Sequence, residues 1–183
     1  MIKRREIRGM NRKKGVSVKE QGNREERKQA KKLSEWMFGD KDMLKKQSDS
    51  GALEIIWSGD VVPMKQMPDE WNKKWPFLME VKNGYKKHYP DFWRYTQLTA
   101  WVKKAHKESK THNQNVLFIV TQFFRKTALV TTNYCPTALP FKVSFPIELD
   151  DQWKFMYVYR LKDMMNIDFR EVFNFNTLIN GSG

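Results

Sequence analysis

The stretch NVLFIVTQFF, residues 115–124, constrains the fold of this 183-residue chain more than any other segment. Almost no polar residue interrupts it, and a short apolar run of this kind predicts a buried strand. The segment PDFWRYTQLTAWVKKAHKES, residues 90–109, predicts a helix with Pro90 in its first turn. TALVTTNY, residues 127–134, predicts the hairpin partner of the buried strand. Together these segments indicate a sheet with helices packed against it.

A second helix is expected near the N-terminus. Asn23 is a good helix N-cap and Gly39 a good helix stop, so we expect the helix to run from Arg24 to Phe38. One face carries residues spaced i, i+4, i+7 and i+11, namely Glu26, Ala30, Leu33 and Met37. Glu26 therefore lies on the face that points to the core, whereas Glu25 does not. The alternative role for Glu26 is that of the partner of Asn23 in a capping box.

Three short strands are expected between the two helices. Residues 53–57 and 60–64 predict a hairpin that follows a polar connection at 39–51. WPFLMEVK, residues 75–82, predicts a third, apolar strand. The order of helices and strands predicts an α/β fold with a central mixed β-sheet flanked by helices.

The chain is expected to divide into three parts. Residues 1–22 predict a basic flexible arm, residues 23–132 the core, and residues 133–183 a C-terminal extension packed on the same domain. The extension includes PFKVSFPIELDDQWKFMYVYRL, for which extending the sheet, forming a dimer surface and binding a partner all stay open.

Charge and composition favour a polyanionic partner. The formal net charge is +13, and residues 1–33 hold thirteen Lys or Arg against four Glu, which leaves +9 in that segment. Such a segment suits phosphate contacts, although a nuclear-localisation tract or a charge that serves only solubility has the same composition. The single cysteine, Cys135, indicates a reducing compartment. No apolar run reaches the roughly 18 to 20 residues of a membrane span, so we expect a soluble intracellular protein without a membrane partner.

Three residues have the types and spacing of a phosphodiesterase site. Asp60 follows the first predicted hairpin strand and its turn, and Glu80 and Lys82 lie at the end of the predicted strand 75–82. Lys82 lies two residues after Glu80, on the same face, while Val81 points to the other face. Two carboxylates suit Mg²⁺, and an adjacent ammonium group can orient water or stabilise the charge of the transition state.

The sequence SGD followed by an apolar strand ending in EVK resembles the PD-(D/E)xK nuclease superfamily. With SGAL, GDVV and FLMEVKN in this order, residues 23–132 look most similar to Holliday junction resolvases of archaeal type and their phage-encoded relatives. The resemblance implies a restriction-endonuclease-like core, metal binding by Asp60, Glu80 and Glu26, and a catalytic Lys82. It also implies that Gln97 sits on the helix that backs the site, where a structural hydrogen bond is the alternative role.

The resemblance implies a Mg²⁺-dependent endodeoxyribonuclease, for which Mn²⁺ can substitute. We expect it to resolve branched DNA as a homodimer in the cytoplasm of a prokaryote or a phage-infected host cell. The alternatives are a restriction-like, nicking or repair endonuclease on duplex DNA, and a non-catalytic nucleic-acid-binding protein.

Further residues are candidates for DNA contacts. Trp71 is the tryptophan that we select for stacking on unpaired bases. Basic and polar residues of the arm and of the segment after the EVK strand are candidates for DNA binding, with a solvated turn as the alternative for the second group: Arg12, Lys13, Lys14, Asn83, Lys86 and Lys87.

Overall fold

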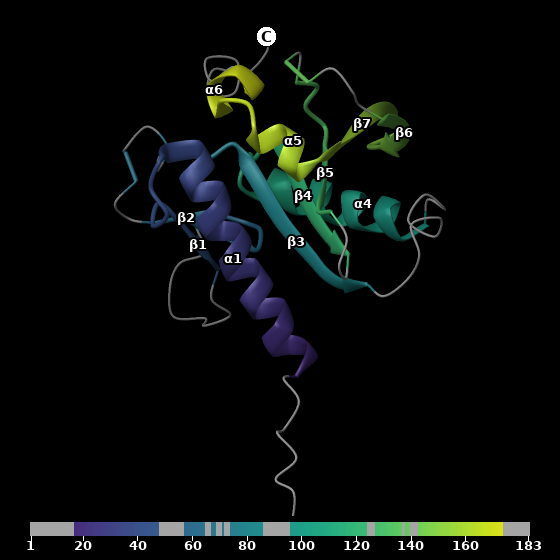
Figure 1. The fold of residues 1–183 in the computed structure, drawn as a ribbon. Coiled ribbons are helices and arrows are strands. Elements are labelled where there is room, and N and C mark those ends of the chain that lie inside the picture. Colours follow the sequence, from purple (N-terminus) through teal and green to yellow (C-terminus); the bar gives the residue numbers. More distant parts are fainter. Residues whose placement is uncertain are drawn as a thin grey trace, which may run out of the picture.

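The computed structural model of the chain describes residues 17–47, 57–64, 67–68, 71, 74–85, 96–123, 127–136, 138–139 and 143–173. These residues form one seven-stranded sheet with helices on both faces (Figure 1). The α/β class and the mixed sheet flanked by helices are therefore confirmed. No described helix is both long enough and apolar enough to cross a membrane.

The sheet has the strand order β1-β2-β3-β4-β5-β7-β6. Its strands are β1 (Leu44–Lys46), β2 (Val61–Pro63), β3 (Phe77–Tyr85), β4 (Val116–Phe123), β5 (Leu129–Thr132), β6 (Val143–Leu149) and β7 (Gln152–Arg160). The strands β3 and β4 pair in parallel, and the other neighbouring pairs in the described sheet are antiparallel. Helix α4 (Thr96–Thr111) lies between β3 and β4 in the chain, as a parallel connection requires.

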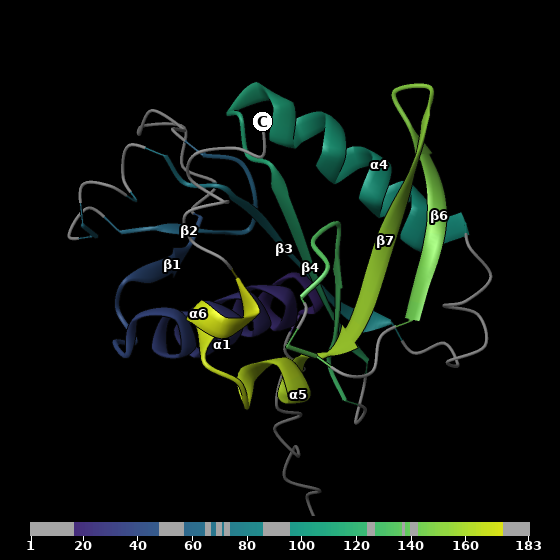
Figure 2. The same cartoon turned by 90° about the horizontal axis from the view of Figure 1, so that it is seen from above.

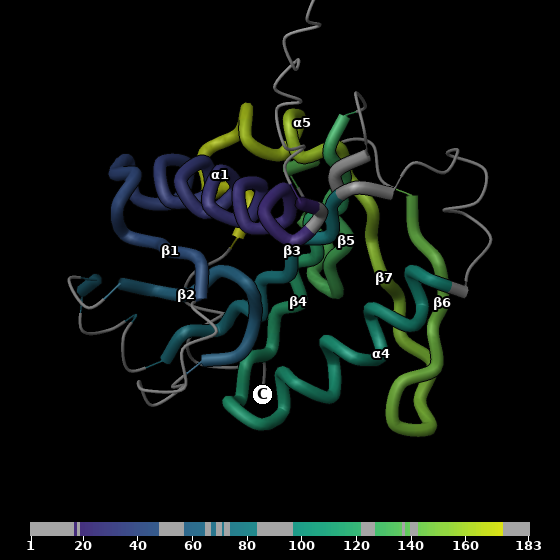
Figure 3. Tube along the Cα trace, turned by 90° about the horizontal axis from the view of Figure 1, so that it is seen from below, coloured from purple at the N-terminus to yellow at the C-terminus, as the bar shows by residue number. Residues whose placement is uncertain are grey.

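The two long helices cover opposite faces of the sheet (Figures 2 and 3). Helix α1 (Val18–Phe38) places Ala30 and Leu33 in a core cluster with Val81, whereas α4 places Val102 in a second cluster with Leu78. Side chains alternate along a strand, so odd-numbered residues of β3 face α1 and even-numbered residues face α4. This alternation decides the face on which each polar residue of β3 lies.

Helix α1 begins earlier than expected. Ser17 is the N-cap, and its hydroxyl accepts a hydrogen bond from the backbone N–H of Glu20 at 3.2 Å. The assignment of Asn23 as the N-cap and the end of the arm at residue 22 are therefore wrong. Ser17 and Glu20 have the spacing of a capping box, which outweighs the cost of Gly22 inside the helix. The stop at Gly39 is confirmed, with φ 70° and its N–H bonded to the Glu35 carbonyl at 2.8 Å.

The sheet edge beside α1 also differs from the expectation. The neighbours of β2 are β3 and β1, and β1 lies in the segment expected to be a polar connection. Most of the predicted partner strand 53–57 lies outside the described residues. Buried Ser34 explains the position of β1, because its hydroxyl accepts the backbone N–H groups of Met43 and Leu44 at 2.9 and 3.1 Å.

The described residues after 142 continue the same sheet. Strands β6 and β7 form a hairpin whose two turn residues, Asp150 and Asp151, have φ values of 53° and 58°. Positive φ at both positions is typical of a type I′ turn, which fits the twist of a hairpin. Strand β6 forms one edge of the sheet and contains Pro146 opposite Phe155. Helices α5 (Leu161–Met165) and α6 (Phe169–Val172) follow and add buried residues to the core beside α1.

Trp71 belongs to this core. It is buried against the rings of Phe38, Trp75 and Phe77, with ring centroids 5.6, 5.7 and 6.4 Å away. The prediction that Trp71 is available to stack on bases is therefore wrong. Burial of a large aromatic surface outweighs the polar character of the residues around it in the sequence.

Candidate active site

The candidate site is centred on the turn at residues 58–60. Gly59 has φ 111°, and a Cβ atom built on it would lie 2.7 Å from the carbonyl oxygen of Met79. This close approach brings the backbone N–H of Asp60 to the same carbonyl oxygen at 2.7 Å. The glycine of the SGD motif is thus required by the backbone of β3, and the turn places Asp60 beside the middle of that strand.

A buried glutamine holds the turn from the other side. Gln114 lies between α4 and β4, and its Oε1 accepts the N–H of Ser58 at 3.1 Å. Its Nε2 donates to the carbonyl oxygens of Ser58 at 3.1 Å and Phe77 at 2.6 Å. The sequence patterns did not reveal Gln114, because its partners are backbone atoms and such contacts leave no motif.

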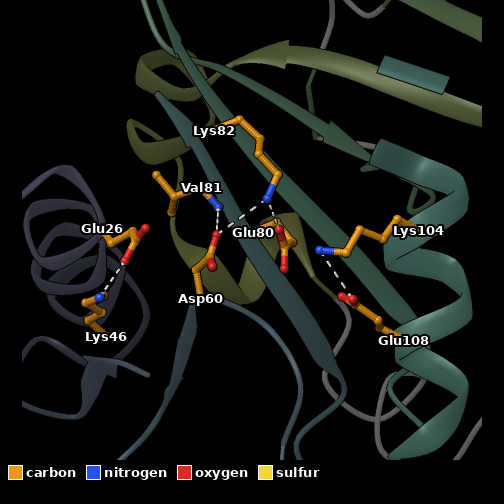
Figure 4. Close-up of polar contacts among 8 residues, drawn as sticks. All are labelled: Glu26, Lys46, Asp60, Glu80, Val81, Lys82, Lys104 and Glu108. Atoms are coloured by element: carbon orange, nitrogen blue, oxygen red, sulfur yellow. Dashed lines mark hydrogen bonds and ion pairs between the residues drawn. The ribbon is translucent and has the colours of Figure 1, made fainter. Parts of the chain in front are cut away.

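Asp60, Glu80 and Lys82 form what we call the acid–lysine cluster (Figure 4). Lys82 Nζ lies 3.7 Å from Asp60 Oδ2 and donates a hydrogen bond to Glu80 Oε2. Asp60 Oδ2 also accepts the backbone N–H of Val81 at 2.8 Å. Glu80 and Lys82 have even numbers and therefore face α4, while Val81 lies in the core beside α1, as the alternation predicts.

The electrostatics of the cluster centre on Glu80, which is only 6% exposed. Burial raises the pKa of Glu80, the Asp60 carboxylate raises it further, and the Lys82 ammonium opposes both effects. Glu108 of α4 adds a small increase in this pKa and is itself paired with Lys104 at 3.4 Å. A buried carboxylate beside a second carboxylate favours a nearby cation, and Lys82 occupies that role in this structure.

Glu26 lies apart from the acid–lysine cluster. Its carboxylate pairs with Lys46 Nζ of β1 at 3.1 Å, and the same ammonium donates to Asn23 Oδ1 at 2.6 Å. Figure 4 shows the Glu26 and Lys46 pair on one side of Asp60, with Lys82 and Glu80 on the other. Within the described parts of the chain, no group of three or more His, Cys, Asp or Glu side chains could hold a metal ion. A metal site that includes Glu26 stays a prediction.

The face of α1 that carries Glu26 is broader than expected. The side chain of Glu25 is 13% exposed and that of Glu26 is 19% exposed, so the distinction drawn between the two residues is wrong. Glu25 accepts a hydrogen bond from buried Gln29 Nε2 at 2.6 Å. The i, i+4 pair of Glu25 and Gln29 draws Glu25 toward the core, which a purely hydrophobic stripe does not reveal.

The other predicted site residues are spread over the fold. Gln97 is exposed near the start of α4, the helix that packs on the face of Glu80, and its catalytic role stays a prediction. Asn83 is half-buried on β3 beyond Lys82. Five candidate DNA-contact residues lie outside the described residues: Arg12, Lys13, Lys14, Lys86 and Lys87.

His106 serves a different contact. Its Nε2 lies 2.6 Å from Asp150 Oδ2, and Lys110 Nζ lies 2.5 Å from the same oxygen. The hydrogen bonds from Lys110 and His106 lower the pKa of Asp150 to about 2. This contact ties the β6–β7 hairpin to α4, so His106 has a structural partner.

Comparisons with models of known protein families, with characterised proteins and with solved structures found no match.

Proposed function

We propose that this chain is a Mg²⁺-dependent, structure-selective endodeoxyribonuclease that cleaves branched DNA. The observation that carries the proposal is the meeting of two carboxylates at one cation. Asp60 comes from the turn before β2 and Glu80 from β3, yet both contact the ammonium group of Lys82. This is the arrangement that the resemblance to PD-(D/E)xK nucleases implies for an acid, a glutamate and a lysine on adjacent strands.

The acid–lysine cluster fits a magnesium site. Mg²⁺ is usually bound through one or two carboxylates, with water and substrate phosphate as the remaining ligands, and Asp60 and Glu80 supply that number. Burial and the Asp60 carboxylate raise the pKa of Glu80, and a cation bound beside Glu80 would oppose both effects. Asp60 is 29% exposed at its side chain, so the cluster is open on the side of Asp60. When bound, Mg²⁺ supplies an activated water and neutralises charge on the phosphoryl oxygens.

Asp60, Glu80 and Lys82 have different roles in the proposed reaction. Asp60 is held by the N–H of Val81, which fixes one carboxylate oxygen in place. Buried Glu80 must be ionised to act as a ligand, and the Lys82 ammonium favours its ionised form. Lys82 can also donate to the attacking water or to a phosphoryl oxygen as negative charge develops there.

Basic side chains on α4 suit a DNA substrate. Helix α4 packs on the face of Glu80 and presents exposed Lys103, Lys104 and Lys107. These residues add to a formal net charge of +13, so we expect the binding constant for DNA to fall steeply as salt is raised. Contacts between lysine side chains and the phosphate backbone of DNA position the protein on the duplex without reading its bases. Resolving a junction also requires two symmetric cuts, which implies a pair of subunits.

The test is a substrate panel of four-way junction, flap, mismatch and linear duplex DNA, incubated with and without Mg²⁺. We expect wild-type protein to cut the four-way junction in a Mg²⁺-dependent reaction. Asp60→Asn, Glu80→Gln and Lys82→Ala should each lower the rate by at least about 100-fold. Glu35→Gln is the matched control, because Glu35 is an exposed acid of α1 paired with Lys41 at 3.4 Å, outside the acid–lysine cluster.

Each other outcome has a definite meaning. Cleavage of junctions by Asp60→Asn and Glu80→Gln at the wild-type rate would refute the proposal. Preferential cleavage of linear duplex would support a Mg²⁺-dependent endonuclease but would make duplex DNA, in place of branched DNA, its substrate. Tight DNA binding without Mg²⁺ binding or cleavage would identify a non-catalytic binding protein.

A further inference from the structure

Gln114 is 3% exposed and makes contacts that only an amide can make. Its carbonyl oxygen accepts one backbone N–H, and its two N–H groups donate to two different carbonyl oxygens. The backbone N–H of Gln114 donates to the Ser109 carbonyl at 2.9 Å, so the residue is anchored to the last turn of α4. The side chain therefore works as a fixed bridge between two segments that are far apart in the sequence.

The two segments bridged by Gln114 carry the acids of the acid–lysine cluster. Ser58 lies two residues before Asp60, and Phe77 lies three residues before Glu80 on β3. The backbone of Gly59, between Ser58 and Asp60, packs directly against the backbone of Met79 on β3, so the turn and the strand are in close contact there. A shift of Ser58 relative to Phe77 would therefore be passed to Asp60 and would change its distance from Glu80.

We propose that Gln114 is a positioning residue for the acid–lysine cluster and sets the separation of Asp60 and Glu80 at which they share one cation. The inference rests on the proposed function. Gln114 acts through the backbone of residues 58 and 77 and touches neither metal nor DNA. Its loss therefore weakens Mg²⁺ binding and lowers kcat, and leaves the KM for DNA unchanged.

Two substitutions separate positioning from packing. Gln114→Glu keeps the size of the side chain and places carboxylate oxygens against the carbonyl oxygens of Ser58 and Phe77, which repel them. Gln114→Met keeps the approximate volume and removes all three hydrogen bonds. Loss of a second layer of contacts behind metal ligands typically costs about 10-fold to 100-fold in metal affinity or activity.

Asn133 provides a control, since it is a second amide that bridges backbone groups, although it is exposed where Gln114 is buried. Its Oδ1 accepts the Leu117 N–H at 2.8 Å, and its Nδ2 donates to the Asn115 carbonyl at 2.9 Å. Asn133→Asp makes the same chemical change as Gln114→Glu beside β4, outside the turn that holds Asp60. It should lower stability without changing Mg²⁺ affinity.

The experiment uses the full chain and measures Mg²⁺ binding by calorimetry, junction cleavage under steady-state conditions, and thermal unfolding. We expect both Gln114 variants to bind Mg²⁺ about 10-fold to 100-fold more weakly and to lose kcat with KM for DNA unchanged within about 2-fold. Raising Mg²⁺ should recover part of the kcat of Gln114→Met. Asn133→Asp should retain the wild-type Mg²⁺ affinity.

The outcomes separate this inference from the proposed function. If wild-type protein neither binds Mg²⁺ nor cleaves DNA, both the proposed function and the role of Gln114 are refuted. If wild-type protein cleaves and Asp60→Asn does not, but both Gln114 variants bind Mg²⁺ and cleave as wild type does, only the inference is overturned. Loss of a cooperative melt in both Gln114 variants, or an equal loss of Mg²⁺ affinity in Asn133→Asp, would assign Gln114 to stability alone and also overturn it.

Discussion

Replacing Gly59 by alanine tests the close contact between the SGD turn and β3. A residue with a side chain at φ 111° is outside the usual left-handed region and costs up to about 3 kcal/mol. The new Cβ atom would also lie 2.7 Å from the oxygen and 3.0 Å from the nitrogen of Met79. Both are backbone atoms of a central strand, so no side-chain rotation relieves the overlap, and crowding of this kind adds about 1 to 3 kcal/mol.

We therefore expect Gly59→Ala to lower the free energy of unfolding by about 4 kcal/mol, which corresponds to a fall in Tm of about 8 to 16 °C. Gly39→Ala is the control, because Gly39 also has positive φ, at 70°. Among the described residues other than its two chain neighbours, no heavy atom lies within 4 Å of the point that a Cβ atom would take there. Its cost is the conformational cost alone, about 1 to 2 kcal/mol.

Replacing glycine by alanine also lowers the conformational entropy of the unfolded chain, which stabilises the folded protein. This contribution is the same for both substitutions and cancels when their free energies of unfolding are compared. The assay is urea unfolding followed by circular dichroism, with thermal melts in parallel. A difference between the two variants of less than about 1 kcal/mol would refute the reasoning, because the contact with Met79 would then contribute almost nothing.

Two further changes test the electrostatics and the core. Because the pKa of Glu80 is raised, the folded protein holds its proton more tightly than the unfolded chain does, and stability is lost as pH rises through that pKa. Glu80→Gln should therefore raise the Tm of the metal-free protein at pH 7 and change it less near pH 4; a lower Tm at pH 7 would contradict this. Trp71→Ala should lower the free energy of unfolding by about 3 to 5 kcal/mol. Trp153→Ala should change it by less than about 0.5 kcal/mol, because Trp153 is 71% exposed, and equal effects in a urea titration would contradict the burial argument.

The centre of the fold was predictable because each of its elements has a strong local pattern. The run at 115–124 has almost no polar interruption, and β4 lies within it, buried from Val116 to Thr121. Its antiparallel pairing with β5 follows from the short polar connection between them. The edges were harder to predict, because β1 has only three residues and is held by the hydroxyl of Ser34, ten residues before Leu44.

The candidate site was predictable where side chains alternate along one strand. Glu80 and Lys82 share a face of β3 because they are two residues apart, and Asp60 reaches them through the turn at Gly59. Gln114 could not be found in this way, since it contacts backbone atoms of distant residues. The pairing of Glu26 with Lys46 depends on the placement of β1, which the sequence pattern had not revealed.

Pro146 limits how this protein can associate. The two-residue turn makes Leu149 and Gln152 a hydrogen-bonded pair, so by alternation Pro146 and Phe155 form a pair without mutual hydrogen bonds. The backbone nitrogen of Pro146 therefore faces away from β7, at the free edge of the sheet, where a proline has no hydrogen to offer. A further strand added along β6 would meet a gap in the middle of its hydrogen-bond ladder, and such a gap opposes edge-to-edge aggregation. If two copies of this chain act together, as the proposed function implies, Pro146 therefore disfavours their pairing through the β6 edge of the sheet.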